Sequence, residues 1–291
     1  MKILISGATG FLGKHVLKQL SLTDHDVFLV VRSRENALAI NRDYPRFTIY
    51  EYDYRKIDSE FASIGNFDVF LNLAWSNLDD FQSSDHLIFE LPAQKEFITQ
   101  IIARGVKAIV SVGTCLEYSK LQGELREDSP CDPEIPYAIA KNQLRNFLRI
   151  QSELKKFNLT WVRLFYFYGP GQPERTLFGQ LVNAVHQEQQ TFDTLTNGLQ
   201  KLDYMHVEDV AKSLVQILFT GQAHGELNIC SGKPRTLRDI TSQWIKDFQW
   251  DVQISWGNQE SRKYESCAFW GSTEKFTEIL KTVGLVTAYE E

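Results

Sequence analysis

Gly7-Ala8-Thr9-Gly10-Phe11-Leu12-Gly13 is the stretch that decides the fold of this 291-residue chain. It follows an apolar run, Ile3–Ser6, which predicts a buried strand, and it opens Phe11–Leu20, which predicts a helix. Glycines at such a junction permit a tight turn and let a pyrophosphate approach backbone N–H groups at the positive end of the helix. A glycine-rich stretch is often only a turn, but the strand-turn-helix context favours a dinucleotide-binding loop.

Outward from this loop, the first half of the chain alternates between strand-like and helix-like segments. The expected strands are Val27–Val31, Thr48–Tyr52, Val69–Leu73, Ala108–Val112 and Leu159–Phe165, and the expected helices cover residues 85–104 and 136–155. Pro92 should break or kink the first of these helices. Strands separated by helices indicate right-handed crossovers, so the sequence predicts an α/β fold with a Rossmann-type, doubly wound parallel sheet covered on both faces.

From about Tyr166 the alternation loosens. The expected elements are a loop over 169–173, helices Leu177–Gln187 and Asp209–Phe219, a hairpin-like turn at Asn197-Gly198 and a strand over Leu227–Cys230. We expect residues 1–165 to form a Rossmann domain that binds the cofactor, and residues 166–291 to form a smaller C-terminal substrate-binding lobe. Part of this lobe, about 203–232, should thread back onto the Rossmann domain.

Composition narrows the class of protein. The chain has 43% hydrophobic and 23% charged residues, which is typical of a globular protein. A formal net charge of −6 argues against non-specific nucleic-acid binding, and no apolar stretch approaches the roughly 20 residues needed to span a bilayer. Cys115, Cys131, Cys230 and Cys267 are scattered without metal-ligand spacing, so we expect no metal and a reduced, cytoplasmic protein, with a disulfide framework as the alternative.

The second expected strand ends at Val31 and is followed by Arg32 and Arg34. An NAD site usually carries an acidic residue near this point, which accepts hydrogen bonds from the adenosine ribose. An arginine instead suits the ribose 2′-phosphate of NADP(H) through charge-assisted hydrogen bonds, so we predict NADP(H) as the cofactor, with a solvated surface arginine as the alternative. Asp53, after the third strand, is expected either to accept from the adenine amino group or to be structural.

Tyr137 and Lys141 lie one helical turn apart and should project from the same face of their helix. A lysine ammonium beside the nicotinamide can hold the ribose hydroxyls and favour the ionised phenol, which exchanges a proton with a carbonyl or alcohol oxygen. Thr114 follows the strand Ala108–Val112 at the carboxyl edge of the sheet, where its hydroxyl can reach the same oxygen. A chance Tyr-x-x-x-Lys pair is the alternative, but the three elements in this order predict a catalytic set.

These features resemble the extended short-chain dehydrogenase/reductase family, and in particular its sugar-nucleotide epimerase, dehydratase and reductase branch. Four further segments resemble motifs of that branch: residues 72–75 (Asn-Leu-Ala-Trp), 163–172 (Arg-Leu-Phe-Tyr-Phe-Tyr-Gly-Pro-Gly-Gln), 203–210 (Asp-Tyr-Met-His-Val-Glu-Asp-Val) and 227–232 (Leu-Asn-Ile-Cys-Ser-Gly). The resemblance covers nearly the whole chain. It implies a nucleotide-linked keto sugar as the substrate and a homodimer as the assembly.

The residues and the resemblance together define the expected site. The cofactor should contact Gly7, Thr9, Gly10, Phe11, Leu12, Gly13, Arg32, Arg34, Asp53, Leu73, Ala74, Trp75, Tyr137 and Lys141. Arg262 falls where such enzymes place an arginine on the substrate diphosphate. Relatives often carry Arg immediately before the Asp-Tyr-x-His-Val motif, whereas Lys201 and Leu202 stand there in this chain, so Lys201 and Arg175 are expected to assist Arg262. His206 is expected to be structural.

The reaction is predicted from what surrounds Thr114. The 4,6-dehydratases of this family place an Asp-Glu pair after the catalytic Thr, and the fucose-type epimerase-reductases use a Cys two residues after it and a His after Tyr-Gly-Pro. This chain has Cys115-Leu116 and Gly171 at those places, so hydride transfer alone remains and Cys115 is expected to be a packed residue. NADPH then favours reduction of the 4-keto group of a nucleotide-linked 4-keto-6-deoxyhexose. The alternatives are a nucleotide-sugar 4-epimerase, a reductase of a non-sugar substrate, and a non-catalytic NADP-sensing regulator.

Overall fold

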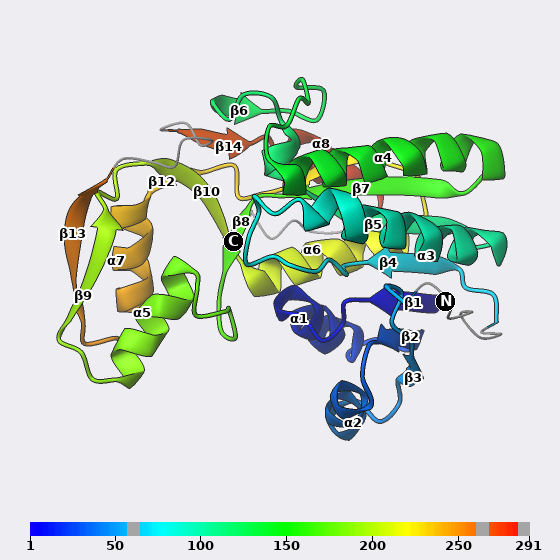
Figure 1. Ribbon diagram of the computed structural model, residues 1–291, viewed down its shortest axis with the longest axis horizontal. Helices are drawn as coiled ribbons and strands as arrows, with labels where there is room; N and C mark the ends of the chain where they lie inside the picture. The colour runs from blue at the N-terminus through cyan, green and yellow to red at the C-terminus, as the bar shows by residue number, and fades with distance from the viewer. Residues whose placement is uncertain (57–64, 260–267, 285–291) are drawn as a thin grey trace.

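A seven-stranded parallel sheet lies at the centre of the computed structural model, which describes residues 1–56, 65–259 and 268–284 (Figure 1). In spatial order the strands are β11 (Gly225–Ile229), β7 (Asn158–Leu164), β5 (Ala108–Thr114), β4 (Val69–Asn72), β1 (Lys2–Ser6), β2 (Asp26–Val31) and β3 (Thr48–Glu51). Strands β4 and β5 are buried at every position, as in sheets that are covered on both faces. The strand order reverses between β1 and β4, which opens a crevice at the carboxyl ends of the strands. The predicted Rossmann-type α/β fold is confirmed.

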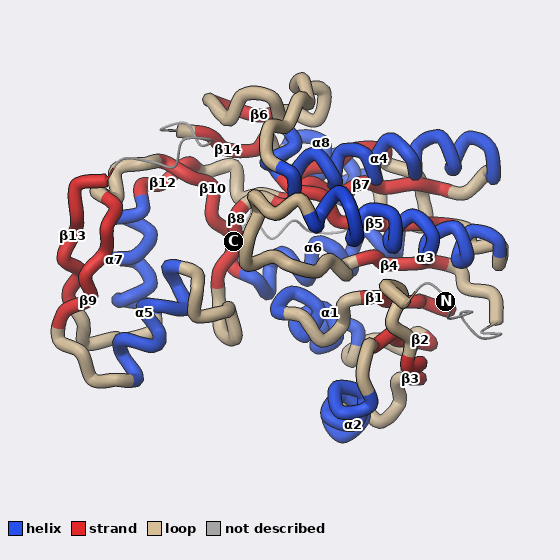
Figure 2. The backbone as a smooth tube through the Cα atoms, viewed as in Figure 1, coloured by secondary structure: helices blue, strands red, loops and turns tan. Residues whose placement is uncertain are grey.

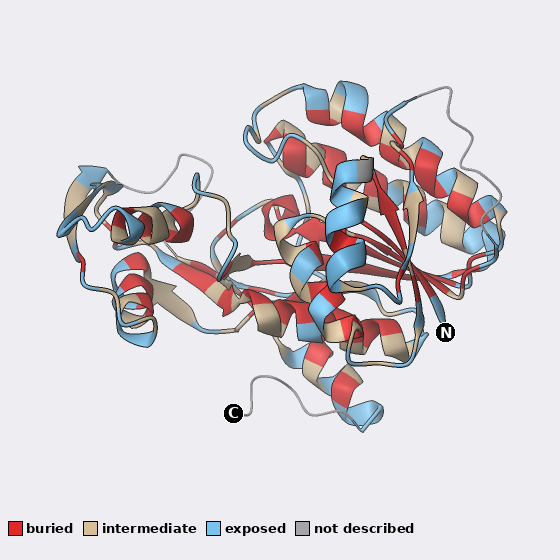
Figure 3. Cartoon of the chain, turned by 90° about the horizontal axis from the view of Figure 1, so that it is seen from below, coloured by how far each residue is buried: buried red, intermediate tan, exposed pale blue. Residues whose placement is uncertain are grey.

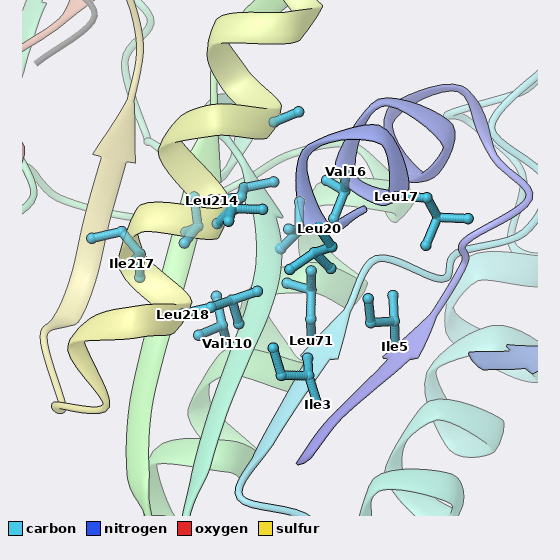
Figure 4. Close-up of a cluster of buried hydrophobic side chains, with 14 of the residues drawn as sticks. Ile3, Ile5, Val16, Leu17, Leu20, Leu71, Val110, Leu214, Ile217 and Leu218 are labelled. Atoms are coloured by element: carbon cyan, nitrogen blue, oxygen red, sulfur yellow. The ribbon is translucent and has the colours of Figure 1, made fainter. Parts of the chain in front are cut away.

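Helices cover both faces of this sheet, and each face has its own apolar core. The covering helices are α1 (Phe11–Leu20), α6 (Val207–Thr220) and α8 (Glu274–Thr282) on one face, α3 (Leu91–Ala103) and α4 (Pro136–Lys155) on the other, and α2 (Arg34–Asp43) beside β3. Consecutive residues of β1 alternate between the faces: Ile3 and Ile5 belong to the first core and Leu4 to the second. Figure 4 shows Leu20 of α1 and Leu214 of α6 in the first core with Ile3 and Ile5.

A smaller lobe extends from the carboxyl edge of the sheet (Figures 1 and 2). It comprises α5 (Leu177–His186), α7 (Leu237–Asp247), the parallel pair β9 (Thr191–Thr196) and β13 (Gln253–Gln259), and a sheet of β12 (Pro234–Thr236), β10 (Lys201–His206) and β8 (Tyr166–Tyr168). A further parallel pair joins β6 (Gly123–Leu125) to β14 (Phe269–Gly271). The core of this lobe is rich in aromatic rings, with Trp244 fully buried between Phe178 and Tyr168.

The chain returns from the smaller lobe to the large sheet. Strand β11 pairs in parallel with β7 over five residues, and helix α6 packs against α1. Figure 3 shows the strands of the sheet buried and the covering helices exposed mainly along their outer sides. Among the described helices, none combines the length and the apolar character that crossing a bilayer requires.

The structure tests several local predictions. Pro92 does not break the helical stretch as predicted: the π-helix η1 (His86–Glu90) runs directly into α3, which begins at Leu91 with the proline in its first turn, where no intrahelical N–H is lost. The predicted hairpin at Asn197-Gly198 is wrong, because β9 before it pairs with β13, whereas β10 after it pairs with β8 and β12. The turn therefore connects strands of two different sheets. Thr114 is the last residue of β5 and does not lie beyond the strand.

Candidate active site

A cavity of about 400 Å³ opens where the carboxyl ends of the central strands meet the smaller lobe. The lining residues come from the large sheet and its loops, such as Gly10 before α1 and Thr114 at the end of β5, and from the smaller lobe, such as Tyr166 of β8. Among the described residues that line it, none is acidic, whereas Arg32, Lys141 and Arg175 are basic. A cavity with this charge balance suits a ligand that carries phosphate groups.

The glycine-rich loop forms one wall of the cavity through Gly7, Thr9, Gly10, Phe11, Leu12 and Gly13. Gly7 has a φ of +78°, and a Cβ atom there would lie 2.6 Å from the backbone nitrogen of Ala74. A Cβ atom on Gly13 would lie 2.2 Å from the carbonyl oxygen of Gly7. Neither position accepts a side chain, so the loop can pack tightly at the N-terminus of α1, where the helix dipole favours an anion. These residues fit a dinucleotide pyrophosphate.

Thr114, Tyr137 and Lys141 all line the cavity, so the structure brings the predicted catalytic set together. The Tyr137 ring stacks on Phe81 with the ring centres 4.7 Å apart. Burial raises the pKa of Tyr137, the charge of Glu117 raises it further, and a hydrogen bond with the Thr114 side chain opposes the rise. The phenol is therefore protonated at neutral pH.

Lys141 is almost fully buried beside this phenol. Its Nζ donates a 2.7 Å hydrogen bond to the carbonyl oxygen of Val112 and lies over the Trp75 ring. Burial lowers the pKa of Lys141 to about 7, although the charges of Glu117 and Glu90 raise it. The amine therefore titrates near neutral pH.

The expected adenosine end of the site is at the carboxyl end of β2. Arg32 lines the cavity and is exposed. Arg34 begins α2, and its side chain lies outside the described part of the structure. Asp53 does not line the cavity, and its carboxylate accepts two 3.1 Å hydrogen bonds from the Arg55 guanidinium. This pairing fits the structural role, and the contact with adenine stays a prediction.

A buried carboxylate behind the cavity was not predicted. Glu90 accepts a 2.6 Å hydrogen bond from the Tyr54 hydroxyl and a hydrogen bond from the Ser76 hydroxyl, and both donors line the cavity. Gln94 donates to the same carboxylate at 2.9 Å. Because Tyr54 and Ser76 give their protons to Glu90, their oxygens can only accept hydrogen bonds from a ligand in the cavity. Since Glu90 lies within a predicted helix, nothing in the local sequence marked it.

The expected substrate residues are placed differently from one another. Arg175 lines the cavity and forms a 2.5 Å ion pair with Asp79. Lys201 is exposed on β10 and does not line the cavity. Arg262 lies outside the described residues. Gln172, at the end of the Tyr-Gly-Pro segment, lines the cavity and donates from Nε2 to the Phe167 carbonyl at 3.1 Å.

Other motif residues hold the lobes together. The Asp203 carboxylate accepts hydrogen bonds from the backbone nitrogens of Ser231, Gly232 and Gly271. His206 caps α6 by accepting from the Glu208 backbone nitrogen at 3.3 Å, which agrees with its expected structural role. Cys115 is 2% exposed and belongs to the core of the smaller lobe.

Comparisons with known proteins identify the family of this chain. The family model described as "NAD dependent epimerase/dehydratase family" matches residues 3–230. The dTDP-6-deoxy-L-talose 4-dehydrogenase (NAD(+)) of Aggregatibacter actinomycetemcomitans is 28% identical to this chain over 94% of its length and 100% of the relative. The chain therefore belongs to the NAD-dependent epimerase/dehydratase family, and the resemblance to extended short-chain dehydrogenases/reductases is confirmed.

Solved structures show the same fold. The UDP-glucuronic acid 4-epimerase of Bacillus cereus, in complex with UDP-glucuronic acid and NAD, superposes with a TM-score of 0.80 at 19% identity, covering 97% of this chain and 93% of that one. The dTDP-glucose 4,6-dehydratase DesIV of Streptomyces venezuelae, with NAD bound, gives a TM-score of 0.79 at 20% identity, covering 96% and 90%. At these identities the likeness establishes the fold.

Proposed function

We propose that this protein is an oxidoreductase that reduces the 4-keto group of a nucleotide-linked 4-keto-6-deoxyhexose with NADPH. The observation that carries the proposal is the convergence of Thr114, Tyr137 and Lys141 in one cavity with the glycine-rich loop. The two residues after Thr114 are Cys115 and Leu116, so no carboxyl pair is present there for dehydration. The relative from Aggregatibacter is named for oxidation at position 4 of a dTDP-linked 6-deoxyhexose. Ketone reduction is the reverse of such an oxidation.

The residues divide the work of this reduction. Bound NADPH would supply the hydride that forms the new C–H bond at the ketone carbon. The Tyr137 hydroxyl donates its proton to the ketone oxygen, so that the product is an alcohol and the phenolate takes up a proton from solvent. The Thr114 hydroxyl donates a supporting hydrogen bond to the same oxygen. The Lys141 ammonium holds the ribose hydroxyls and stabilises the transient phenolate.

NADPH is the proposed cofactor because of the charges around the adenosine end of the site. Arg32 lies at the cavity and no described lining residue is acidic, which favours a ribose 2′-phosphate. Arg34 follows two residues later at the start of α2. The relative from Aggregatibacter is named with NAD(+), which makes the cofactor the first property to measure.

The substrate diphosphate is proposed to bind Arg175, with Arg262 and Lys201 as further candidates from the sequence. Arg175 is the one for which the structure offers support, because it lines the cavity on the side of the smaller lobe. We also propose a cytoplasmic homodimer. Exposed Ile88 and Phe89 on η1 and Ile150 and Leu154 on α4, two elements that pack together, give a candidate apolar interface.

The test is a panel of nucleotide-linked 4-keto-6-deoxyhexoses incubated with NADPH or NADH, with NMR spectroscopy of the sugar product. We expect NADPH consumption matched by one new C–H bond at C4. Interconversion of two 4-epimers without net cofactor consumption would favour the 4-epimerase. Tight NADPH binding with no turnover of any keto compound would favour the non-catalytic regulator.

A further inference from the structure

A second buried carboxylate lies directly behind the catalytic set. Glu117 ends the short 3-10 helix η2 (Cys115–Glu117), and its side chain has no exposed surface. Its Oε1 accepts a 2.8 Å hydrogen bond from the backbone nitrogen of Thr114, and both carboxylate oxygens accept from Trp161 Nε1 at 3.0–3.1 Å. The Thr-x-x-Glu spacing forms a capping box, which is a signal that the sequence carried.

The charge of this carboxylate is balanced on the side away from the cavity. Arg163, 1% exposed on β7, donates from Nε to Glu117 Oε2 at 3.3 Å. The same guanidinium also donates to the Tyr118 hydroxyl at 3.2 Å, and Arg145 Nε lies 3.9 Å from Glu117 Oε2. Burial raises the pKa of the Glu117 carboxyl and the Arg163 guanidinium opposes the rise. Both oxygens of Glu117 accept from N–H donors, and the guanidinium beside them stays charged, so this environment favours the ionised carboxylate.

The backbone beside Glu117 has no room for a side chain at position 113. A Cβ atom on Gly113 would lie 2.2 Å from Glu117 Oε1 and 2.3 Å from Trp161 Nε1. The residue before Gly113 is Val112, whose carbonyl accepts from Lys141, and the residue after it is Thr114. Three consecutive residues at the end of β5 therefore link Glu117 to the catalytic lysine and threonine.

We propose that Glu117 is a positioning residue for the reaction assigned above: it holds the Thr114 end of β5, to which Lys141 is hydrogen-bonded at Val112, and it supplies a negative charge to that part of the site. The inference rests on the proposed function for its meaning in catalysis. The effect of Glu117 on the protonation of Lys141 can be measured without any substrate.

The charged and titratable groups around Lys141 determine whether its pKa rises or falls when the charge of Glu117 is removed. Glu117 on η2 and Glu90 on η1 raise its pKa, and burial, the largest influence, lowers it to about 7. Tyr137 is the titratable neighbour on the same helix, and the Arg163 and Arg145 cations lie beyond Glu117. Without the charge of Glu117, only Glu90 still opposes the lowering of the Lys141 pKa by burial. The pKa of Lys141 should then fall, and the ammonium should be lost at lower pH.

The experiment is NMR titration of the cofactor-free protein labelled with 13C at lysine Cε. The Lys141 signal is identified by its absence from a Lys141→Met sample. In Glu117→Gln its midpoint should move to lower pH by on the order of one pH unit. The matched control is Glu226→Gln, because Glu226 also pairs with an arginine, the half-buried Arg145 at 2.5 Å, and should leave the midpoint unchanged. An unchanged midpoint in Glu117→Gln overturns the proposal.

Glu117→Gln leaves Arg163 without its carboxylate and could prevent folding. Glu117→Asp keeps the negative charge on a side chain that is shorter by one methylene group. The Lys141 midpoint in this variant should therefore lie between the wild-type value and the value expected without any charge at position 117. A Glu117→Asp midpoint equal to that of wild type overturns the proposal as well. Because no ketone is used, a wild-type protein that reduces no sugar nucleotide refutes the proposed function and leaves this measurement valid.

Discussion

The Lys141 ammonium lies 4.0 Å from the centre of the Trp75 ring. The Trp75 indole is held in turn by a 3.1 Å hydrogen bond from its Nε1 to His86 Nδ1. Since His86 accepts there, its Nε2 carries the proton and donates to the Asp80 carbonyl at 2.9 Å. A neutral histidine, an indole face and one backbone carbonyl thus hold a buried cation in place before any ligand binds.

Holding this cation should lower the stability of the protein. The pKa of Lys141 is lowered to about 7 by burial, so between pH 7 and about 10 the unfolded chain binds a proton that the folded chain has lost. Wild-type stability should therefore rise with pH across that window through this group. Lys141→Met should raise the free energy of unfolding at pH 7 by roughly 2–4 kcal/mol while abolishing activity.

Urea unfolding at pH 6, 7 and 9 measures this difference. The gain of Lys141→Met over wild type should be largest at pH 6 and should shrink toward pH 9. Lys155→Met, an exposed lysine on the same helix, is the control and should change stability little at any pH. A Lys141→Met variant less stable than wild type at pH 6 would show that the ammonium stabilises the fold.

Tyr137→Phe removes only a hydroxyl, so the fold and NADPH binding should survive. Because general acid catalysis contributes typically 10²–10⁴-fold, kcat should fall on that scale. Cys115→Ser is the matched comparison, since Cys115 is packed in the same wall and is assigned no chemistry. Stopped-flow measurement of NADPH oxidation gives both rates. Loss of turnover in Cys115→Ser, or solvent deuterium at a carbon beside the ketone, would instead implicate proton abstraction.

Arg32→Ala should weaken NADPH binding and leave NADH binding nearly unchanged. Loss of a charge-assisted contact to the 2′-phosphate corresponds to about 1.5–3 kcal/mol, or roughly tenfold or more in Kd. Arg42→Ala is the control, because Arg42 lies on α2, pairs with Asp43 and does not line the cavity. Calorimetry decides the matter: a wild-type protein that binds NADH as tightly as NADPH contradicts the proposed cofactor.

Arg175→Ala should raise KM for the sugar nucleotide by about tenfold and leave the Kd of NADPH unchanged. Asp79→Ala is the comparison variant, because it frees Arg175 from its ion pair and keeps the guanidinium. In Asp79→Ala, KM should stay the same or fall. If Arg175→Ala changes neither constant, the diphosphate binds elsewhere, and Arg262→Ala becomes the next variant to measure.

Features set by neighbouring residues were predicted well from the sequence. The glycine loop, the first helix and the helix Pro136–Lys155 appear with the predicted bounds, because a tight turn and a helical period are local properties. Tyr137 and Lys141 share a face for the same reason. Their meeting with Thr114 followed from the rule that parallel strands end at one edge of the sheet.

Features set by distant partners were not predicted. Glu117 is buried because Arg163, 46 residues away, reaches it, and no local pattern reports such a pairing. Strand β9 pairs with β13, which follows about 60 residues later in the chain, and the sequence around Asn197-Gly198 does not report this pairing. The turn was therefore predicted to close a hairpin. Helices α2, α7 and α8 were missed too, although a helix is a local feature.

The pairing of β11 with β7 has a consequence for synthesis on the ribosome. Strand β7 is complete at Leu164, but its outer edge stays without a partner until Gly225–Ile229 has emerged. During that interval an apolar parallel strand presents open N–H and C=O groups, which is a template for intermolecular pairing. A nascent chain arrested between these two points would hold the complete glycine loop and catalytic set on a sheet with one open flank. Such a chain would depend on chaperones for its solubility.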